Sequence, residues 1–133
     1  MSASRWLSLT LVILAVSGCA LPHPPVIFDV QTRQIQRDVH RCVIAELVDS
    51  DFQITESRVD DGIVRALRAA TERWSYFVAE WDLIEVLIFA RNDLSTGLQF
   101  TSRTLIGDKE NGKEKVPSAD VQSVAREVAD ACG

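Results

Sequence analysis

The chain has 133 residues, of which 47% are hydrophobic and 25% are charged, and its formal net charge at pH 7 is −5. This length fits one domain, and the composition excludes a disordered chain, a collagen-like repeat and a protein with several membrane spans. The pI near 5.0 disfavours nucleic-acid binding, which usually requires a basic face, so we expect no nucleic-acid partner.

An apolar run near the start of the chain has the length of the apolar part of a secretory signal sequence. It covers residues 6–16, follows a single basic residue, and leads into Val16-Ser17-Gly18-Cys19. Such a run is about half as long as a bilayer-spanning helix. The final four residues resemble the lipobox of bacterial lipoproteins, in which an aliphatic residue and two small residues precede a cysteine.

That resemblance implies a lipoprotein signal peptide over residues 1–18 and a diacylglyceryl group on the sulfur of Cys19. Two or three acyl chains, each methylene worth roughly 0.8 kcal/mol, would hold a folded domain on a membrane. The residue after the cysteine is Ala20 and not aspartate, which by the same resemblance favours the inner leaflet of the outer membrane. We therefore expect a membrane partner through the lipid and a domain facing the periplasm.

Residues 19–30 are expected to form the lipidated cysteine and a short tether. Three of the four prolines fall here, at Pro22, Pro24 and Pro25, and such a stretch prefers extended geometry. A single folded domain is then expected over residues 31–133.

The next segments predict a helix and a hairpin. Residues 31–49 carry an apolar stripe at helical spacing. Its members are Ile35, Val39, Cys42, Val43 and Leu47. Residues 52–59 and 63–67 then predict two strands around the turn Asp60-Asp61-Gly62.

Residues 71–83 fit two structures. Helical spacing favours a short helix, with Thr71 as its cap, whereas alternation also fits a strand. Four aromatic residues gather here, at Trp74, Tyr76, Phe77 and Trp81. They either cover the sheet as core or form an exposed patch for an envelope protein or peptidoglycan.

Two more strands and a final helix complete the prediction. Residues 84–91 and 97–106 predict strands, the first apolar on both faces, and residues 107–116 predict a solvated loop. Pro117-Ser118 opens a helix with a second apolar stripe. This stripe comprises Val121, Val124, Ala125, Val128 and Cys132.

Cys42 and Cys132 each lie on an apolar stripe of a predicted helix. An exported protein meets an oxidising compartment, so we expect a disulfide between them, with buried free thiols as the alternative. The bond would close a loop of about 90 residues, worth roughly 4–5 kcal/mol by chain entropy. His40-x-Cys42 lacks further ligands at useful spacing, so no metal site and no cofactor are expected.

The expected fold is α+β, with a four-stranded antiparallel sheet flanked by an N-terminal and a C-terminal helix. The helix followed by Phe52-x-Ile54-x-x-Ser57-x-x-x-x-Gly62-Ile63 resembles a pattern of small bacterial envelope lipoproteins. That resemblance implies a helix-grip-like arrangement over residues 33–132 and no particular activity.

No phosphate loop, nucleophile elbow or zinc motif occurs in the sequence. His23 lies in the tether, where a catalytic residue could not be held in place, and His40 lies beside the apolar stripe, where we expect a surface or boundary residue. We therefore expect a non-catalytic binding or structural module. One alternative is a small hydrolase with Glu80, Asp82 or Glu85 near Trp81, and another is a small-ligand carrier with a cleft between sheet and helices.

Overall fold

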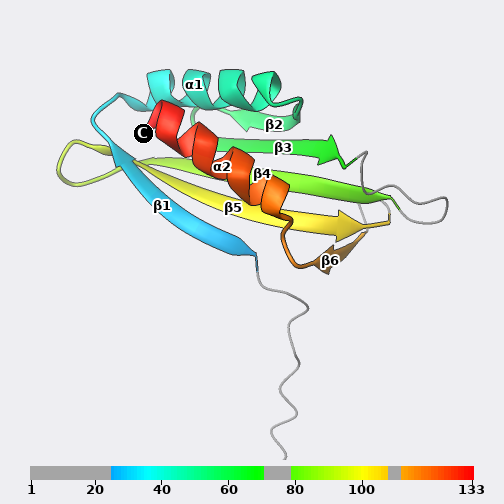
Figure 1. The fold of residues 1–133 in the computed structure, drawn as a ribbon. Coiled ribbons are helices and arrows are strands. Elements are labelled where there is room, and N and C mark those ends of the chain that lie inside the picture. Colours follow the sequence, from blue (N-terminus) through cyan, green and yellow to red (C-terminus); the bar gives the residue numbers. More distant parts are fainter. Residues whose placement is uncertain (1–24, 71–78, 108–111) are drawn as a thin grey trace, which may run out of the picture.

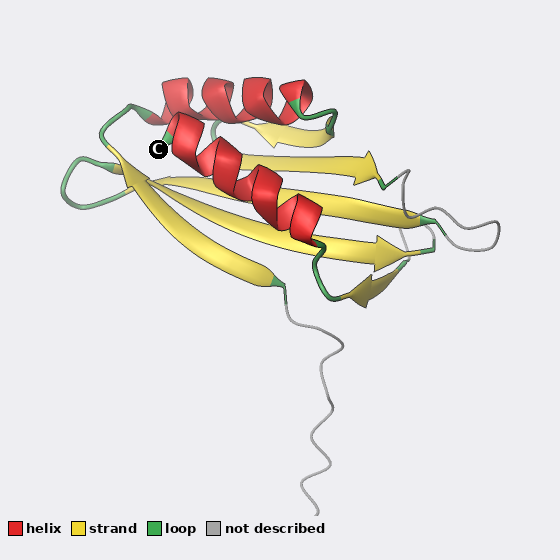
Figure 2. Ribbon diagram, viewed as in Figure 1, coloured by secondary structure: helices red, strands yellow, loops and turns green. Residues whose placement is uncertain are grey.

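The computed structural model describes residues 25–70, 79–107 and 112–133. In these ranges an antiparallel sheet carries two helices on one of its faces (Figures 1 and 2). The elements in chain order are β1 (Val26–Thr32), α1 (Gln36–Asp49), β2 (Gln53–Arg58), β3 (Ile63–Ala69), β4 (Glu80–Ala90), β5 (Thr96–Ile106), β6 (Lys113–Lys115) and α2 (Ala119–Cys132).

The α+β class with an antiparallel sheet and two helices is confirmed, but the expected strand number is wrong. The sheet has six strands in the order β1-β5-β4-β3-β2, and β6 also pairs with β5. β1 pairs with β5 from Thr96 to Ser102, and β6 pairs with it from Thr104 to Ile106. The two strands therefore share one edge of β5. The helices lie side by side on one face and do not flank the sheet (Figure 2).

β1 corrects the expected end of the tether. Residues 26–30 were assigned to the proline-rich segment, yet they belong to a seven-residue strand. Val26, Phe28 and Val30 alternate with exposed residues, which is the pattern of a strand with one covered face. The aromatic ring of Phe28 stacks on that of Phe100 in β5, with 5.0 Å between ring centroids. This short segment is a strand because it pairs with β5.

Segment 71–83 is only partly described. Residues 71–78, with Trp74, Tyr76 and Phe77, lie outside the described residues. Residues 80–83 belong to β4, so a helix reaching residue 83 is wrong. Residues 113–115, expected in a loop, form β6. β6 pairs with the last residues of β5 and satisfies backbone groups of β5 that β1 does not reach.

Both predicted helices form, and both bury their apolar stripes. In α1, Val39, Val43 and Leu47 are 0% exposed, but Ile35 precedes the helix and is 64% exposed. Helix α1 begins five residues later than predicted, because residues 31–32 belong to β1 and residues 33–35 connect β1 to the helix. All five residues of the α2 stripe are buried. They pack against the helix-bearing face of the sheet, whose largest buried side chains are Phe100, Ile84, Leu98, Val64 and Val86.

Candidate binding surface

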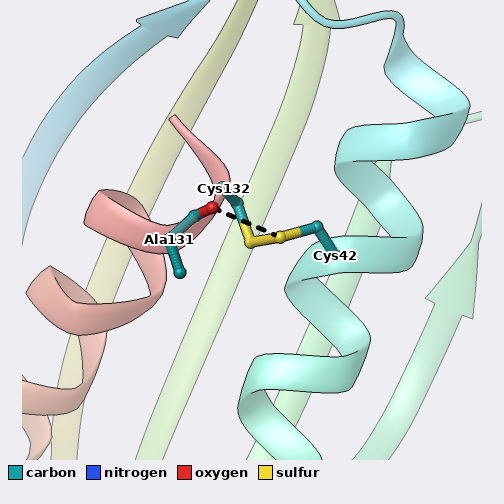
Figure 3. The surroundings of a disulfide bond; sticks show 3 residues. All are labelled: Cys42, Ala131 and Cys132. Carbon is teal, nitrogen blue, oxygen red and sulfur yellow. Dashed lines mark hydrogen bonds between the residues drawn. A yellow bond between two sulfur atoms is a disulfide. The ribbon is translucent and has the colours of Figure 1, made fainter.

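A disulfide joins the two helices at one end of the domain (Figure 3). The Cα atoms of Cys42 and Cys132 lie 5.7 Å apart, and the bond spans 90 positions of sequence. Cys132 is fully buried. The Sγ atom of Cys42 lies 3.7 Å from the carbonyl oxygen of Ala131, a contact without a hydrogen bond because a disulfide sulfur has no hydrogen to donate. The expected pairing is therefore present in the structure.

Trp81 is the described member of the predicted aromatic patch. It lies in β4 and is half-buried. Because side chains alternate along a strand, that of Trp81 projects from the sheet face opposite the helices. The indole N–H donates to the carbonyl oxygen of Gly107 at 3.1 Å. Trp81 therefore stabilises the end of β5, and the rest of the patch, Trp74, Tyr76 and Phe77, lies outside the described residues.

The three acidic residues around Trp81 divide between the two faces of the sheet. Glu80 and Asp82 have the parity of the helix-bearing face, whereas Trp81 and Glu85 have the other parity. Glu80 forms a salt bridge of 2.7 Å with Lys115. A hydrolytic pair of carboxylates flanks a single scissile bond, so both groups must face the same substrate-binding cleft. This division does not favour the hydrolase alternative.

Asp82 is the centre of a buried polar cluster at the start of α2. It is 1% exposed, and its Oδ1 accepts hydrogen bonds from the hydroxyls of Thr104 and Ser118 at 2.9 and 3.0 Å. The hydroxyl of Ser118 in turn accepts from the backbone N–H of Val121. Arg68 lies 3.9 Å from the other carboxylate oxygen. These contacts fix the first turn of α2 on the sheet.

Arg68 also reaches the end of α1. Its Nη1 donates to the carbonyl oxygen of Ser50 at 2.9 Å, and its guanidinium lies over the ring of Phe52, 4.5 Å from the centroid. Both helices are thus connected to the β3–β4 ladder by charged groups. This cluster explains the packing and leaves no open site for a substrate among its contacts.

His40 is buried and not at the surface, contrary to expectation. It is 3% exposed, and its Nε2 lies 2.9 Å from the hydroxyl of Ser57 in β2. Its Nδ1 is buried and forms no hydrogen bond with any residue that the structure describes. Burial lowers the pKa of His40. A Ser–His pair enclosed in this way, with no carboxylate on Nδ1, is not arranged for nucleophilic catalysis.

The sheet face opposite the helices carries an ion-pair stripe across its centre. Arg65 in β3 bridges Glu56 and Glu85, at 3.0 and 2.6 Å. Arg58 pairs with Glu56 and with Asp61 at the adjacent turn. The hydrogen bond from Arg65 to Glu85 raises the pKa of the Arg65 guanidinium. Since these charges satisfy one another, the stripe offers little net charge to a ligand.

The turn between β4 and β5 has an unusual backbone. The N–H of Leu94 donates to the carbonyl oxygen of Arg91, and the N–H of Arg91 donates to that of Ser95. Leu94 has a φ of 66°, in the left-handed region where glycine and asparagine are normally found. Its side chain is 96% exposed. A strained backbone thus presents an aliphatic side chain to solvent.

Side chains hold this turn in one conformation. The Asp93 carboxylate accepts from the N–H and hydroxyl of Ser95 and from the amide of Gln31 in β1. The hydrogen bonds from Ser95 are the main cause that lowers the pKa of Asp93. One strand position further on, the hydroxyl of Thr96 donates to the carbonyl oxygen of Gln34. The turn is therefore fixed to the β1–α1 connection.

Exposed apolar residues gather at the end of the domain that contains this turn. They are Ile35, Val59, Phe89 and Leu94, which are 64, 52, 40 and 96% exposed. The turn also forms a hollow of about 530 Å³. It is lined by Phe89, Ala90, Arg91, Asn92 and Asp93. We call these four apolar side chains and the hollow the turn surface.

The sequence predicts the turn but not the surface. Asn92 to Thr96 has the composition of a turn. The isolated leucine within it is the one feature of the sequence that could have indicated an exposed binding surface. The positive φ of this leucine and the position of Phe89 opposite Gly97 depend on the β4–β5 register, which pairs Ala90 with Thr96. The turn surface is the candidate binding site, whereas the predicted aromatic patch is represented among described residues by Trp81 alone.

A scan of the chain against known protein families finds no match, and a search of curated proteins finds none either. Within the three described ranges, no group of three or more acidic, histidine or cysteine side chains is placed to hold a metal ion. Neither α1 nor α2 has the length and hydropathy of a membrane-crossing helix.

Proposed function

We propose that this protein is a lipid-anchored lipoprotein of the bacterial envelope, whose domain faces the periplasm and acts as a non-catalytic binding module. The observation that carries the binding role is Leu94, an aliphatic side chain 96% exposed on a turn with a positive φ. Such strain persists only where the surrounding structure enforces it, and it concentrates at functional positions. The lipobox Val16-Ser17-Gly18-Cys19 supports the anchor.

The position of β1 is compatible with a short tether between the membrane and the domain. Cys19 precedes Val26, the first residue of β1, by seven positions, and a fully extended chain of that length spans at most about 25 Å. The domain would then stay close to the membrane. The full chain has a net charge of −5, and removal of residues 1–18 with Arg5 would leave 13 basic and 19 acidic side chains, or −6. This acidic charge disfavours flat binding to anionic headgroups.

Mass spectrometry of the mature protein from bacterial membranes tests the anchor. We expect a chain that begins at Cys19 and carries two or three acyl groups. Cys19→Ser should abolish this modification and remove the mature chain from the membrane fraction. A Cys42→Ser/Cys132→Ser variant is the matched control and should still be acylated. An unmodified Cys19, or a Cys19→Ser variant that matures and fractionates like the wild type, would contradict the proposal.

A further inference from the structure

We infer that the turn surface docks a protein segment in which an aliphatic side chain lies next to a carboxylate. The inference rests on the proposed binding function and specifies its partner. The apolar half of the argument is the exposure of Phe89 and Leu94, which precede and follow the turn residues Arg91 to Asp93 and are 40 and 96% exposed. Phe89 lines the hollow, and its ring lies where a Cβ atom on Gly97 would be. Glycine at that position leaves space for the Phe89 ring against β5.

Arg91 supplies the polar half of the argument. Its side chain lines the hollow and is exposed. Among the residues that the structure describes, Arg91 forms no salt bridge, whereas Arg58 at the same end is already paired with Glu56 and Asp61. An unpaired guanidinium beside an aromatic ring recognises a carboxylate next to an apolar group.

The acidic groups of this end do not compete for Arg91. Asp93 accepts hydrogen bonds from Ser95 and Gln31 within its own turn. Asp61 pairs with Arg58, and Asp60 belongs to the β2–β3 turn and does not line the hollow. A carboxylate of a partner would therefore meet a cation that the fold has left available.

The direction of β1 favours a protein over the anchoring membrane. β1 begins beside Ser102 and ends beside Thr96, two positions after Leu94. Its seven residues cover about 20 Å. β1 therefore begins far from the β4–β5 turn, which lies beyond the other end of β1 (Figure 1). A domain extended from its anchor presents Leu94 away from the lipid.

Photo-crosslinking in the native cells tests this docking. The full chain carries p-benzoylphenylalanine at Phe89, a substitution of one aromatic side chain by another. A matched chain carries it at Val116, which is 55% exposed and lies before α2 at the tether end. We expect a protein adduct from position 89 and not from position 116. The crosslinked peptide, identified by mass spectrometry, should contain an aliphatic residue next to Asp or Glu.

Two variants examine the two halves of the recognition. Leu94→Gly relieves the backbone strain and removes the apolar side chain, so the fold persists and the adduct should fall by about tenfold or more. Arg91→Glu should reduce the adduct similarly, whereas Lys113→Glu, an exposed cation at the other end, should not. An adduct with lipid or peptidoglycan, an equal adduct from position 116, no adduct, or no response to Leu94→Gly would each overturn the inference.

Failure of the anchor gives a different result. If Cys19 carries no lipid, the chain leaves the membrane fraction while the protein adduct at position 89 remains. If the turn surface has no protein partner, the chain stays acylated and the adduct is missing.

Discussion

Ser118 donates a hydrogen bond of 3.0 Å to the carboxylate of Asp82, a residue 36 positions earlier in the chain. The same hydroxyl accepts from the N–H of Val121 and caps α2. One side chain therefore both starts the helix and fixes its position on β4. The N-terminal end of α2 is connected to the sheet at this point.

Removal of this hydroxyl should destabilise the fold measurably. Ser118→Ala loses the cap and leaves a buried carboxylate with one donor fewer, so we expect the free energy of unfolding to fall by about 2 kcal/mol. Ser123→Ala, at an exposed position of the same helix, should change it by less than about 0.5 kcal/mol. Urea unfolding followed by circular dichroism measures both. Equal effects would show that the contact with Asp82 is dispensable.

The disulfide should contribute strongly to stability because it closes a loop across most of the domain. Cys42 and Cys132 are separated by 90 positions, which corresponds to roughly 4–5 kcal/mol by chain entropy. Reduction should therefore lower the urea midpoint of the wild type markedly. A Cys42→Ala/Cys132→Ala variant should start at the lower midpoint and show no response to reductant. A wild type insensitive to reductant would contradict this prediction.

His40 predicts a loss of stability in mildly acidic solution. Burial lowers the pKa of His40 from its ordinary value of 6.5, so below that pH the unfolded chain binds more protons than the folded one. The free energy of unfolding should fall as the pH decreases from about 7 through 6.5 towards the lower folded pKa. His40→Gln should flatten this dependence, and His23→Gln should not. Equal slopes for the wild type and His40→Gln would exclude the assignment.

Leu94→Gly should increase stability, in contrast to its effect on docking. Leu94 has a φ of 66°, and a left-handed conformation costs a bulky residue about 1–2 kcal/mol. Glycine adopts it freely, so we expect a gain of about 1 kcal/mol. Asp51, with a φ of 65°, is the control, because aspartate tolerates this region better and Asp51→Gly should gain less. A loss of stability in Leu94→Gly would show that the leucine packs within the fold.

Gly62 should tolerate no side chain. It has a φ of 66°, and a Cβ atom there would lie 1.9 Å from the backbone oxygen of Ile88. Gly107 has a φ of 101° but nothing within 4 Å of such an atom. We expect Gly62→Ala to cost about 3 kcal/mol or more and Gly107→Ala about 1 kcal/mol. Thermal unfolding measures both, and similar values would show that β4 moves aside at little cost.

Local periodicity was sufficient where an element buries one face along its own length. The stripe from Val121 to Cys132 predicts α2 and the buried position of its cysteine, and Asp60-Asp61-Gly62 predicts the first hairpin. The ladder between β4 and β5 also places Leu98 and Phe100 inward, as alternation requires. In these segments the sequence neighbours determine the structure.

Other features depend on residues distant in the sequence. Residues 26–30 follow three prolines, and only their pairing with β5 makes them a strand. His40 is adjacent to the predicted stripe, but its hydrogen-bond partner is Ser57 in β2, 17 positions later in the chain. The turn at Leu94 is recognisable, whereas the position of Phe89 opposite Gly97 follows from the strand register. The candidate site was therefore the least predictable part of the domain.

The edge position of β1 has a mechanical consequence. The chain enters β1 at the end away from the turn surface, and β1 pairs with β5 over seven residue pairs. Tension between an anchored cysteine and a partner at Leu94 would run parallel to the strands. The force would load all of these residue pairs at the same time and would not separate them one by one. The edge strand β1 is therefore oriented to resist such a pull.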